Sequence, residues 1–237
     1  MATPVRALSR SILADQVKER LLEGILSGRY APDSRIVETQ VARELGTSQA
    51  PVREALRGLE ALGVVEITPF RGARVRRPTR RELLEAYVVR AALEGLAARL
   101  AVPRLAQADL DELTAHVAEM EAAAAAGDGH RVAEADARFH GRIVELADNE
   151  TLARVWRSLE PFSRTYITLV VPGADPQWSA DLHPPILDAL RGGDAETVVA
   201  ALEAHFAEVS ANMARRLEDD PAARDGAQAT ADGEGEA

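Results

Sequence analysis

The stretch Val41-Ala42-Arg43-Glu44-Leu45-Gly46-Thr47-Ser48-Gln49-Ala50-Pro51-Val52-Arg53-Glu54-Ala55-Leu56 decides the fold of the first part of the chain. Gly46 is the residue type that most often ends a helix, because it adopts the left-handed conformation without steric cost. Ser48 is a favoured N-cap, and Pro51 suits the first turn of a helix, where its missing N–H costs nothing. The stretch therefore predicts two short helices joined by a tight turn.

The second of these helices has two different faces. Apolar residues at i, i+3, i+4 and i+7 spacing mark the side that packs on a core, and they are Val52, Ala55, Leu56, Leu59 and Leu62. The residues four apart on the other side are Gln49, Arg53 and Arg57. Amide and guanidinium groups on an exposed face suit the reading of base edges in a DNA major groove. By itself the pattern leaves an ordinary helical hairpin with a solvated arginine face equally open.

The residues that follow predict a small basic hairpin. Val65 and Ile67, and then Ala73 and Val75, alternate with polar residues, and the segment 69–72 has turn chemistry. The arginines at its tip and second strand are Arg71, Arg74, Arg76 and Arg77. Such a density of positive charge suits phosphates or an adjacent minor groove.

A helix-turn-helix followed by a basic hairpin resembles the GntR family of bacterial transcription regulators. The match runs from a first helix at 12–27 through Pro51–Leu56 to Arg71–Val75, and it covers roughly residues 8–78. The resemblance implies a winged helix-turn-helix domain at 8–77. The residues expected to contact DNA are Gln49, Arg53, Arg57, Arg71, Gly72 and Arg74. Many relatives carry arginine where this chain has Gln49, so their base preference at that position does not carry over.

Charge is distributed unevenly along the 237 residues. Residues 1–80 hold 14 basic and 9 acidic side chains, a net charge of +5, whereas the remainder holds 14 and 29, a net charge of −15. This asymmetry suits a DNA-binding domain joined to a domain that avoids DNA. The chain has no cysteine, no apolar run long enough to span a membrane and no signal-peptide pattern. We therefore expect a cytoplasmic protein with no membrane partner.

After residue 77 the sequence predicts only helices. Thr79 and Glu82 form a capping box that opens a long helix to about residue 102. The further predicted helices are 104–126, 129–147, 149–171, 183–192 and 194–218, with Asn149 and Asp194 as N-caps. The fold class is therefore mostly α, with a helical bundle at 79–217 and a disordered acidic tail at 218–237.

Histidine positions raise the question of a metal site. Asp136 and His140 are at i and i+4, which places both side chains on one helix face, within reach of a single cation. A surface hydrogen bond between the two is the more common outcome for such a pair. His183 precedes two prolines, and His205 lies on a largely apolar helix face, where a neutral core histidine is the alternative.

Residues 80–216 resemble the FCD ligand-binding domain of FadR-like GntR regulators. The resemblance implies that Asp136, His140, His183 and His205 hold one divalent ion per chain, whereas His116 and His130 match no ligand position. Oxygen and nitrogen donors without sulfur suit Zn foremost, and also Ni, Mn, Co or Fe. Open coordination positions would take a small carboxylate effector. Arg90 matches an arginine of the family that suits an effector carboxylate, and an Arg90–Glu94 helix pair is the alternative. Arg138 and Arg164 are weaker candidates.

These observations favour a transcription regulator that binds a palindromic double-stranded DNA operator as a homodimer. Repression is the commoner mode among the relatives, and we expect a small carboxylate to control operator binding. We expect no catalytic residues. One alternative from another class is a metal-dependent hydrolase with an accessory nucleic-acid-binding domain, which the lack of a candidate general base disfavours. The other is an architectural DNA-binding protein, which the acidic two-thirds of the chain disfavours.

Overall fold

The computed structural model describes residues 6–68, 71–165 and 175–218, apart from the side chains of helix residues 6–12, 80, 160–165 and 216–218. The protein is mostly helical, as predicted, and divides into two compact units between Arg77 and Pro78. The first unit contains α1 (Arg6–Leu26), β1 (Arg35–Ile36), α2 (Glu38–Glu44), α3 (Gln49–Ala61), β2 (Val65–Thr68) and β3 (Gly72–Val75). The second contains α4 (Arg80–Ala101), the 3-10 turn η1 (Val102–Arg104), α5 (Gln107–Ala125), α6 (Gly129–Leu146), α7 (Glu150–Thr165), α8 (Pro176–Asp181), α9 (Pro184–Gly192) and α10 (Ala195–Glu218).

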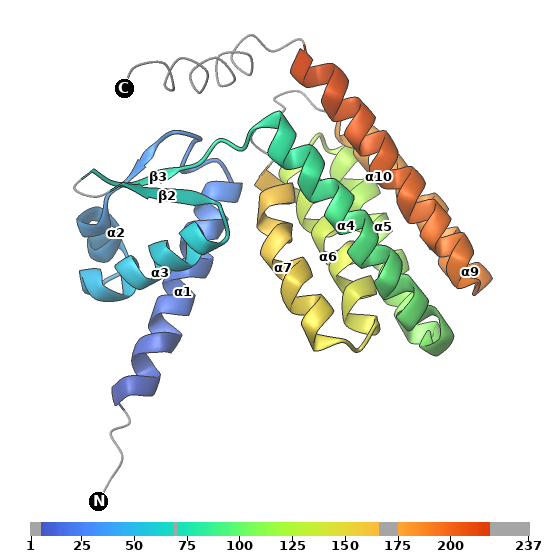
Figure 1. Ribbon diagram of the computed structural model, residues 1–237, viewed down its shortest axis with the longest axis horizontal. Helices are drawn as coiled ribbons and strands as arrows, with labels where there is room; N and C mark the ends of the chain where they lie inside the picture. The colour runs from blue at the N-terminus through green and yellow to red at the C-terminus, as the bar shows by residue number, and fades with distance from the viewer. Residues whose placement is uncertain (1–5, 69–70, 166–174, 219–237) are drawn as a thin grey trace, which may run out of the picture. The chain divides into compact units, whose positions relative to one another are not determined.

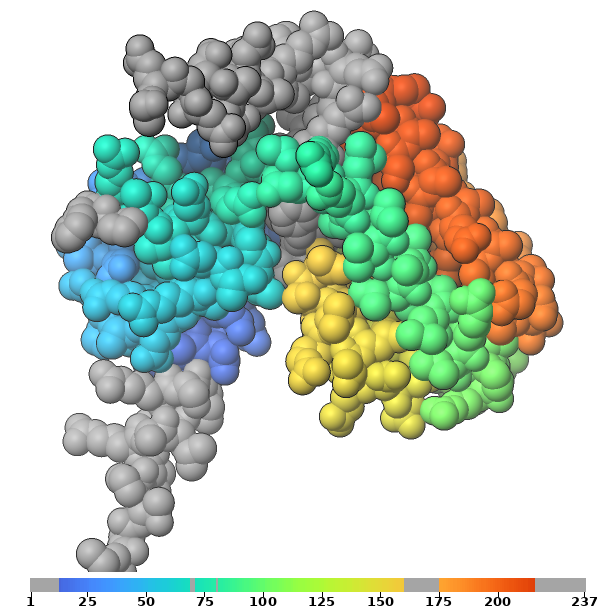
Figure 2. Space-filling model, viewed as in Figure 1, coloured from blue at the N-terminus to red at the C-terminus, as the bar shows by residue number. Residues whose placement is uncertain are grey.

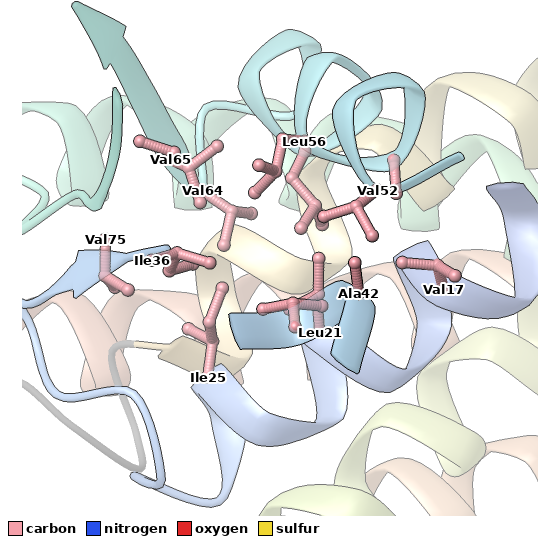
Figure 3. Close-up of a cluster of buried hydrophobic side chains, with 14 residues drawn as sticks. Val17, Leu21, Ile25, Ile36, Ala42, Val52, Leu56, Val64, Val65 and Val75 are labelled. Atoms are coloured by element: carbon pink, nitrogen blue, oxygen red, sulfur yellow. The ribbon is translucent and has the colours of Figure 1, made fainter. Parts of the chain in front are cut away.

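The first unit is a winged helix, in which α1, α2 and α3 share one core with a three-stranded antiparallel sheet of order β1-β3-β2 (Figure 1). Figure 3 shows the apolar side chains of the helices and strands meeting in that core. The labelled ones are Val17, Leu21, Ile25, Ile36, Ala42, Val52, Leu56, Val64, Val65 and Val75. Because every element contributes to this one cluster, the orientation of α3 is fixed by packing.

The turn between α2 and α3 is formed largely as predicted. Gly46 has a φ of +62°, which the left-handed turn requires. Ser48 lies at the N-cap of α3, but its side chain makes no capping hydrogen bond, so the expected Ser48 cap is wrong in that respect. The predicted hairpin is present as β2 and β3. The strand β1 was not predicted, because two residues are too few to show an alternating pattern.

The second unit is a bundle of helices, and its described part contains no strand. Thr79 and Glu82 form the predicted capping box at the start of α4. α4 packs against α6, α7 and α10, whereas α5 packs against α6, α8 and α9. Asn149 and Asp194 accept hydrogen bonds from the backbone N–H of Leu152 and Thr197, as predicted N-caps do.

Two differences from the predicted helices lie in the second unit. The six-residue α8 was missed, because it is shorter than the window over which helical periodicity shows. The region predicted to begin a helix at 104 starts instead with η1, and α5 begins at Gln107. The expected continuation of the α7 helix to 171 falls outside the described residues, as does the acidic tail expected at 218–237 apart from its first residue, which ends α10. Among the described residues, no helix is both long and apolar enough to cross a membrane.

Candidate DNA-binding surface and metal centre

The structure places the predicted reading residues of α3 together on its exposed side. Gln49, Arg53 and Arg57 are all exposed, whereas Val52 and Leu56 between them are buried in the core. The sequence forms a helix here with one apolar stripe, so the other side is left to solvent. This side of α3 can enter a major groove without disturbing the packing of the unit.

Arg53 is not free on this surface. Its Nη2 and Nε donate to Oε2 of Glu38 at 3.0 and 3.2 Å, and Glu38 is the first residue of α2. The hydrogen bond and the negative charge of Glu38 raise the pKa of Arg53 above its ordinary value. Sequence inspection missed Glu38, because the two residues are 15 apart and lie on different helices.

The wing arginines divide into exposed and bracing side chains. Arg71 and Arg74 are exposed, and Arg74 also donates to the carbonyl of Asp33 at 2.9 Å. Arg76 is half-buried and donates to the carbonyl of Gly63, so it braces the wing. Arg77 pairs with the carboxylate of Asp33 at 3.1 Å. Of these, Arg71 and Arg74 are the better placed for DNA.

The structure adds Arg35 to this surface. Arg35 on β1 pairs in register with Arg74 on β3, and its guanidinium lies beside Gly72. Gly72 has a φ of +85°, so a residue with a side chain there would be strained, although its Cβ would only touch that guanidinium at ordinary contact distance. Arg35 was missed because nothing in the sequence shows that it lies next to the wing.

The four predicted metal ligands meet inside the helical unit. Asp136 and His140 come from α6, His183 is the N-cap residue of α9, and His205 comes from α10. All four are buried, and one ligand atom from each lies within 4.8 Å of the others. Ligand atoms bound to one ion at about 2.0–2.2 Å lie at most about 4.4 Å apart, so the set needs only a slight contraction.

Hydrogen bonds orient two of the imidazoles toward this centre. Nδ1 of His183 lies 3.0 Å from the carbonyl of Ser179, and Nδ1 of His140 lies 2.5 Å from Oε2 of Glu94. A carbonyl or carboxylate oxygen accepts, so each Nδ1 donates and leaves Nε2 with a lone pair when the ring is neutral. Holding a ligand histidine by its second nitrogen is typical of metal sites.

This arrangement calls for a cation. Nε2 of His183 lies 3.0 Å from Oδ1 of Asp136, and two acceptors at that distance repel unless a proton or a metal ion lies between them. Nε2 of His140 and Nδ1 of His205 are buried with no hydrogen-bond partner. Each such group costs about 1–3 kcal/mol if left unsatisfied. The donor set therefore fits a divalent metal ion.

The electrostatics of Asp136 and His205 favour the forms of these two groups that bind metal. Burial opposes the charge of Asp136, but His140 and His183 more than compensate and hold its pKa below the ordinary value. Burial lowers the pKa of His205 well below its usual value, and the neighbouring His183 and His140 lower it further. An ionised carboxylate and a neutral imidazole are the states that ligate a metal.

A buried cluster of polar and aromatic side chains lies beside the four candidate ligands. The sequence predicted only one of its contacts. Arg90 and Glu94 of α4 form the ion pair that the sequence offered as the alternative to an effector-binding Arg90, with 3.0 Å between Nε and Oε1. Their side chains are only 3% and 0% exposed. Oε1 of Glu94 also accepts from the indole of Trp156 at 2.7 Å. The guanidinium of Arg90 lies 5.2–5.9 Å from the ring centres of Tyr87, Trp156 and Phe206.

Glu94 therefore joins Arg90 and Trp156 to the candidate ligand His140. Burial alone would raise the pKa of Glu94, but the charges of His140 and Arg90 and the hydrogen bonds to His140 and Trp156 hold it at about 2. Nη2 of Arg90 has no well-aligned hydrogen-bond acceptor, although Oε1 of Glu94 lies 2.9 Å away. The i, i+4 spacing indicated the ion pair, but nothing in the sequence pointed to the contact with His140.

The other candidates lie away from this centre. His130 faces Glu134, whereas His116 and Arg138 line a surface groove of about 410 Å³ between α5, α6 and α7. Arg138 pairs there with Glu119 at 2.6 Å. The side chain of Arg164 is outside the described residues.

Comparison with known proteins identifies the family of each of the two units. Residues 13–75 match the family described as bacterial regulatory proteins, gntR family, and residues 85–208 match the FCD domain. The chain belongs to the GntR family of transcription regulators. It is 36% identical to the "Probable D-xylose utilization operon transcriptional repressor" of Paenarthrobacter nicotinovorans, over 85% of this chain and 89% of the relative.

Other GntR proteins share the whole architecture. The gluconate operon transcriptional repressor of Bacillus subtilis is 24% identical over 87% of each chain. The solved structure of McbR/YncC from E. coli superposes with a TM-score of 0.77 at 24% identity, covering 86% of this chain and 97% of that one. A GntR regulator from Rhodococcus gives a TM-score of 0.74, covering 84% and 96%. At these identities the two structures support the fold.

Proposed function

We propose that this GntR-family regulator is a repressor whose operator affinity is controlled by a small carboxylate bound at a divalent metal ion in the helical domain. The observation that carries this is the buried set of Asp136, His140, His183 and His205, whose geometry calls for a cation. It lies in a chain whose other unit is a winged helix with an exposed reading face. The proposed target is chromosomal DNA, so we place the protein in the cytoplasm.

The donor set supports one divalent ion per chain, with Zn first and Ni, Mn, Co or Fe as the other candidates. When bound, such an ion supplies a Lewis-acidic anchor for an anionic ligand. Arg90 would complete the effector site through its Nη2, which has no well-aligned acceptor. A carboxylate is the ligand that both a metal ion and a guanidinium favour.

The names of the relatives narrow the chemistry of the effector. Two related repressors control gluconate operons, and gluconate is a hydroxycarboxylate. A third is named for the D-xylose utilization operon. We therefore propose a sugar acid, which offers a carboxylate and a neighbouring hydroxyl to one ion.

A homodimer that reads a palindrome is the proposed assembly. α4 exposes Val88, Val89 and Leu96, which are 70%, 46% and 44% accessible, and the adjacent α7 exposes Val155 at 41%. Figure 2 shows α4 in green and α7 in yellow side by side on one face of the helical unit. Exposed apolar side chains on two helices that pack together support contact with a second copy. Two winged helices would then read two half-sites.

The hydrolase alternative lacks a base. Glu94 is the carboxylate in contact with the cluster beyond Asp136, and His140, Trp156 and Arg90 already occupy its oxygens. A pKa of about 2 makes it a poor proton acceptor. No observation in the described residues favours catalysis.

Two measurements test the proposal. Elemental analysis should find about one divalent ion per chain in the wild type and none in a variant with all four ligands changed to alanine. The matched control, His116→Ala with His130→Ala, should keep its metal. An unchanged metal content in the four-ligand variant would contradict the assignment.

Gel-shift titration then tests the effector. Xylonate and gluconate should release the operator, whereas neutral D-xylose, which lacks the carboxylate, should not. By linkage, the effector must bind the operator complex more weakly by the same factor, typically about 5–150-fold. Equal effector affinities for free and DNA-bound protein would show that the site does not control DNA binding.

A further inference from the structure

The contact between Glu38 and Arg53 has a consequence for how the protein reads DNA. Glu38 begins α2, and Arg53 is central on the exposed side of α3. Oε2 of Glu38 accepts from both Nη2 and Nε of Arg53, at 3.0 and 3.2 Å. The carboxylate therefore holds one edge of the guanidinium fork.

The contribution of this ion pair to folding stability is too small to explain its presence. The side chains of Arg53 and Glu38 are 53% and 28% accessible, and exposed ion pairs contribute little to folding. A carboxylate on this surface also repels DNA phosphates, so it lowers affinity for every sequence. A residue that weakens general binding and adds little stability is explained if it improves discrimination between sequences.

The geometry of the guanidinium supplies that explanation. Arginine has five N–H donors in a rigid planar fork. Glu38 uses the Nε–H and one N–H of Nη2, which leaves the outer edge, formed by Nη1 and the second N–H of Nη2. Two parallel donors of this kind match O6 and N7 of guanine. The flexible arginine is also ordered before DNA arrives, so it loses less conformational freedom on binding.

We propose that Glu38 is a positioning residue that holds Arg53 in the orientation that reads guanine. This rests on the proposed role of Arg53 as a base-contacting residue. Glu38 itself contacts no base. Its negative charge lowers the affinity for DNA of any sequence, and its contact with Arg53 raises the selectivity at the base pair that Arg53 reads.

The test uses the full-length protein and a random double-stranded DNA library. Sites selected by the wild type define its base preferences, and the same library is then bound by Arg53→Ala, Glu38→Gln and the double variant. We expect Arg53→Ala to erase the guanine preference at one position of each half-site. Glu38→Gln should reduce discrimination at that same position about three- to tenfold, while affinity for poly(dA-dT) stays equal or rises. In the double variant, Glu38→Gln should have no further effect on preference.

A matched control removes the same charge without touching Arg53. Glu54→Gln, on the exposed side of α3, should raise non-specific affinity as Glu38→Gln does and leave every base preference unchanged. If Arg53→Ala relaxes the preference but Glu38→Gln does not, the positioning role is refuted and the role of Arg53 stands. If Glu38→Gln acts equally with and without Arg53, the positioning role is also refuted. If Arg53→Ala itself changes nothing, both proposals fail.

Discussion

Replacing Glu94 by glutamine should destabilise the helical unit strongly, although the two side chains have nearly the same shape. Glu94 and Arg90 are almost fully buried, at 0% and 3% exposed. The amide cannot neutralise Arg90, so the change leaves a positive charge in the interior. Breaking a buried ion pair in this way costs about 3–5 kcal/mol.

The surroundings of Arg90 favour a loss of unfolding free energy near the lower end of this range. The three rings around the guanidinium keep their cation–π attraction. The amide oxygen can still accept one hydrogen bond, from Trp156 or from Arg90. We therefore expect about 3 kcal/mol. The amide NH₂ would also face the Nδ1–H of His140, which favours moving the ring proton to Nε2 and blocks that nitrogen as a ligand.

Urea unfolding of metal-free protein in EDTA measures the loss. The chain has two tryptophans, Trp156 on α7 and Trp178 on α8, so tryptophan fluorescence follows the helical unit alone. At an m-value of about 2 kcal/mol per molar, 3 kcal/mol moves the midpoint down by about 1.5 M.

The control is the double variant Arg90→Met, Glu94→Gln. It removes the unpaired charge and should recover most of the lost stability, because the interior then holds no uncompensated charge. A loss below about 1 kcal/mol in Glu94→Gln would refute the reasoning, since the buried charge would then not matter. A double variant less stable than the single one would refute it equally.

Three further predictions concern other parts of the chain. Protein held at a free metal concentration 100 times the Kd should have an unfolding free energy of the helical unit about 2.7 kcal/mol higher than chelated protein. In Asp136→Asn, unfolding followed by fluorescence should show little of this difference. Gly58→Ala should stabilise the winged helix by about 0.5–1 kcal/mol, because the added methyl meets only the flexible stem of Lys18; a lower calorimetric midpoint would show that Lys18 cannot move aside. Thr79→Ala should cost about 1 kcal/mol by removing the cap of α4, whereas Thr79→Ser should cost much less, and equal losses in urea titrations would argue against the cap.

The winged helix could be predicted because its signals are local. Gly46 ends α2, the apolar stripe of α3 repeats within three turns, and the hairpin strands alternate over a few residues. The capping box of α4 is also contained within four residues. The two-residue β1 and the six-residue α8 are too short to carry a period, so they were missed.

The proposed metal site could be predicted only in part from the residues themselves. Asp136 and His140 lie one helical turn apart, so their spacing indicates a shared face. His183 contacts Asp136 across 47 residues, and that contact depends on how α6 and α9 pack. Its place in the ligand set, and that of His205, came from the resemblance to the FCD domain. The contacts of Glu94 with His140 and of Glu38 with Arg53 were missed for the same reason, because each joins residues of two different helices.

α4 is the element that connects the proposed sites. Its inner face carries Arg90 and Glu94, of which Glu94 accepts the hydrogen bond from His140, and its outer face exposes the neighbouring Val88 and Val89 to the proposed partner copy. The same continuous helix begins at Arg80, three residues after the boundary between the two units. An effector can shift the operator affinity only by as much as it favours one arrangement of the protein over another. A ligand that draws on Arg90 competes with Glu94 for it, and so acts directly on the helix that also carries the proposed dimer face. Loss of the Arg90–Glu94 pair should therefore weaken the coupling between effector and operator more than it weakens operator binding itself.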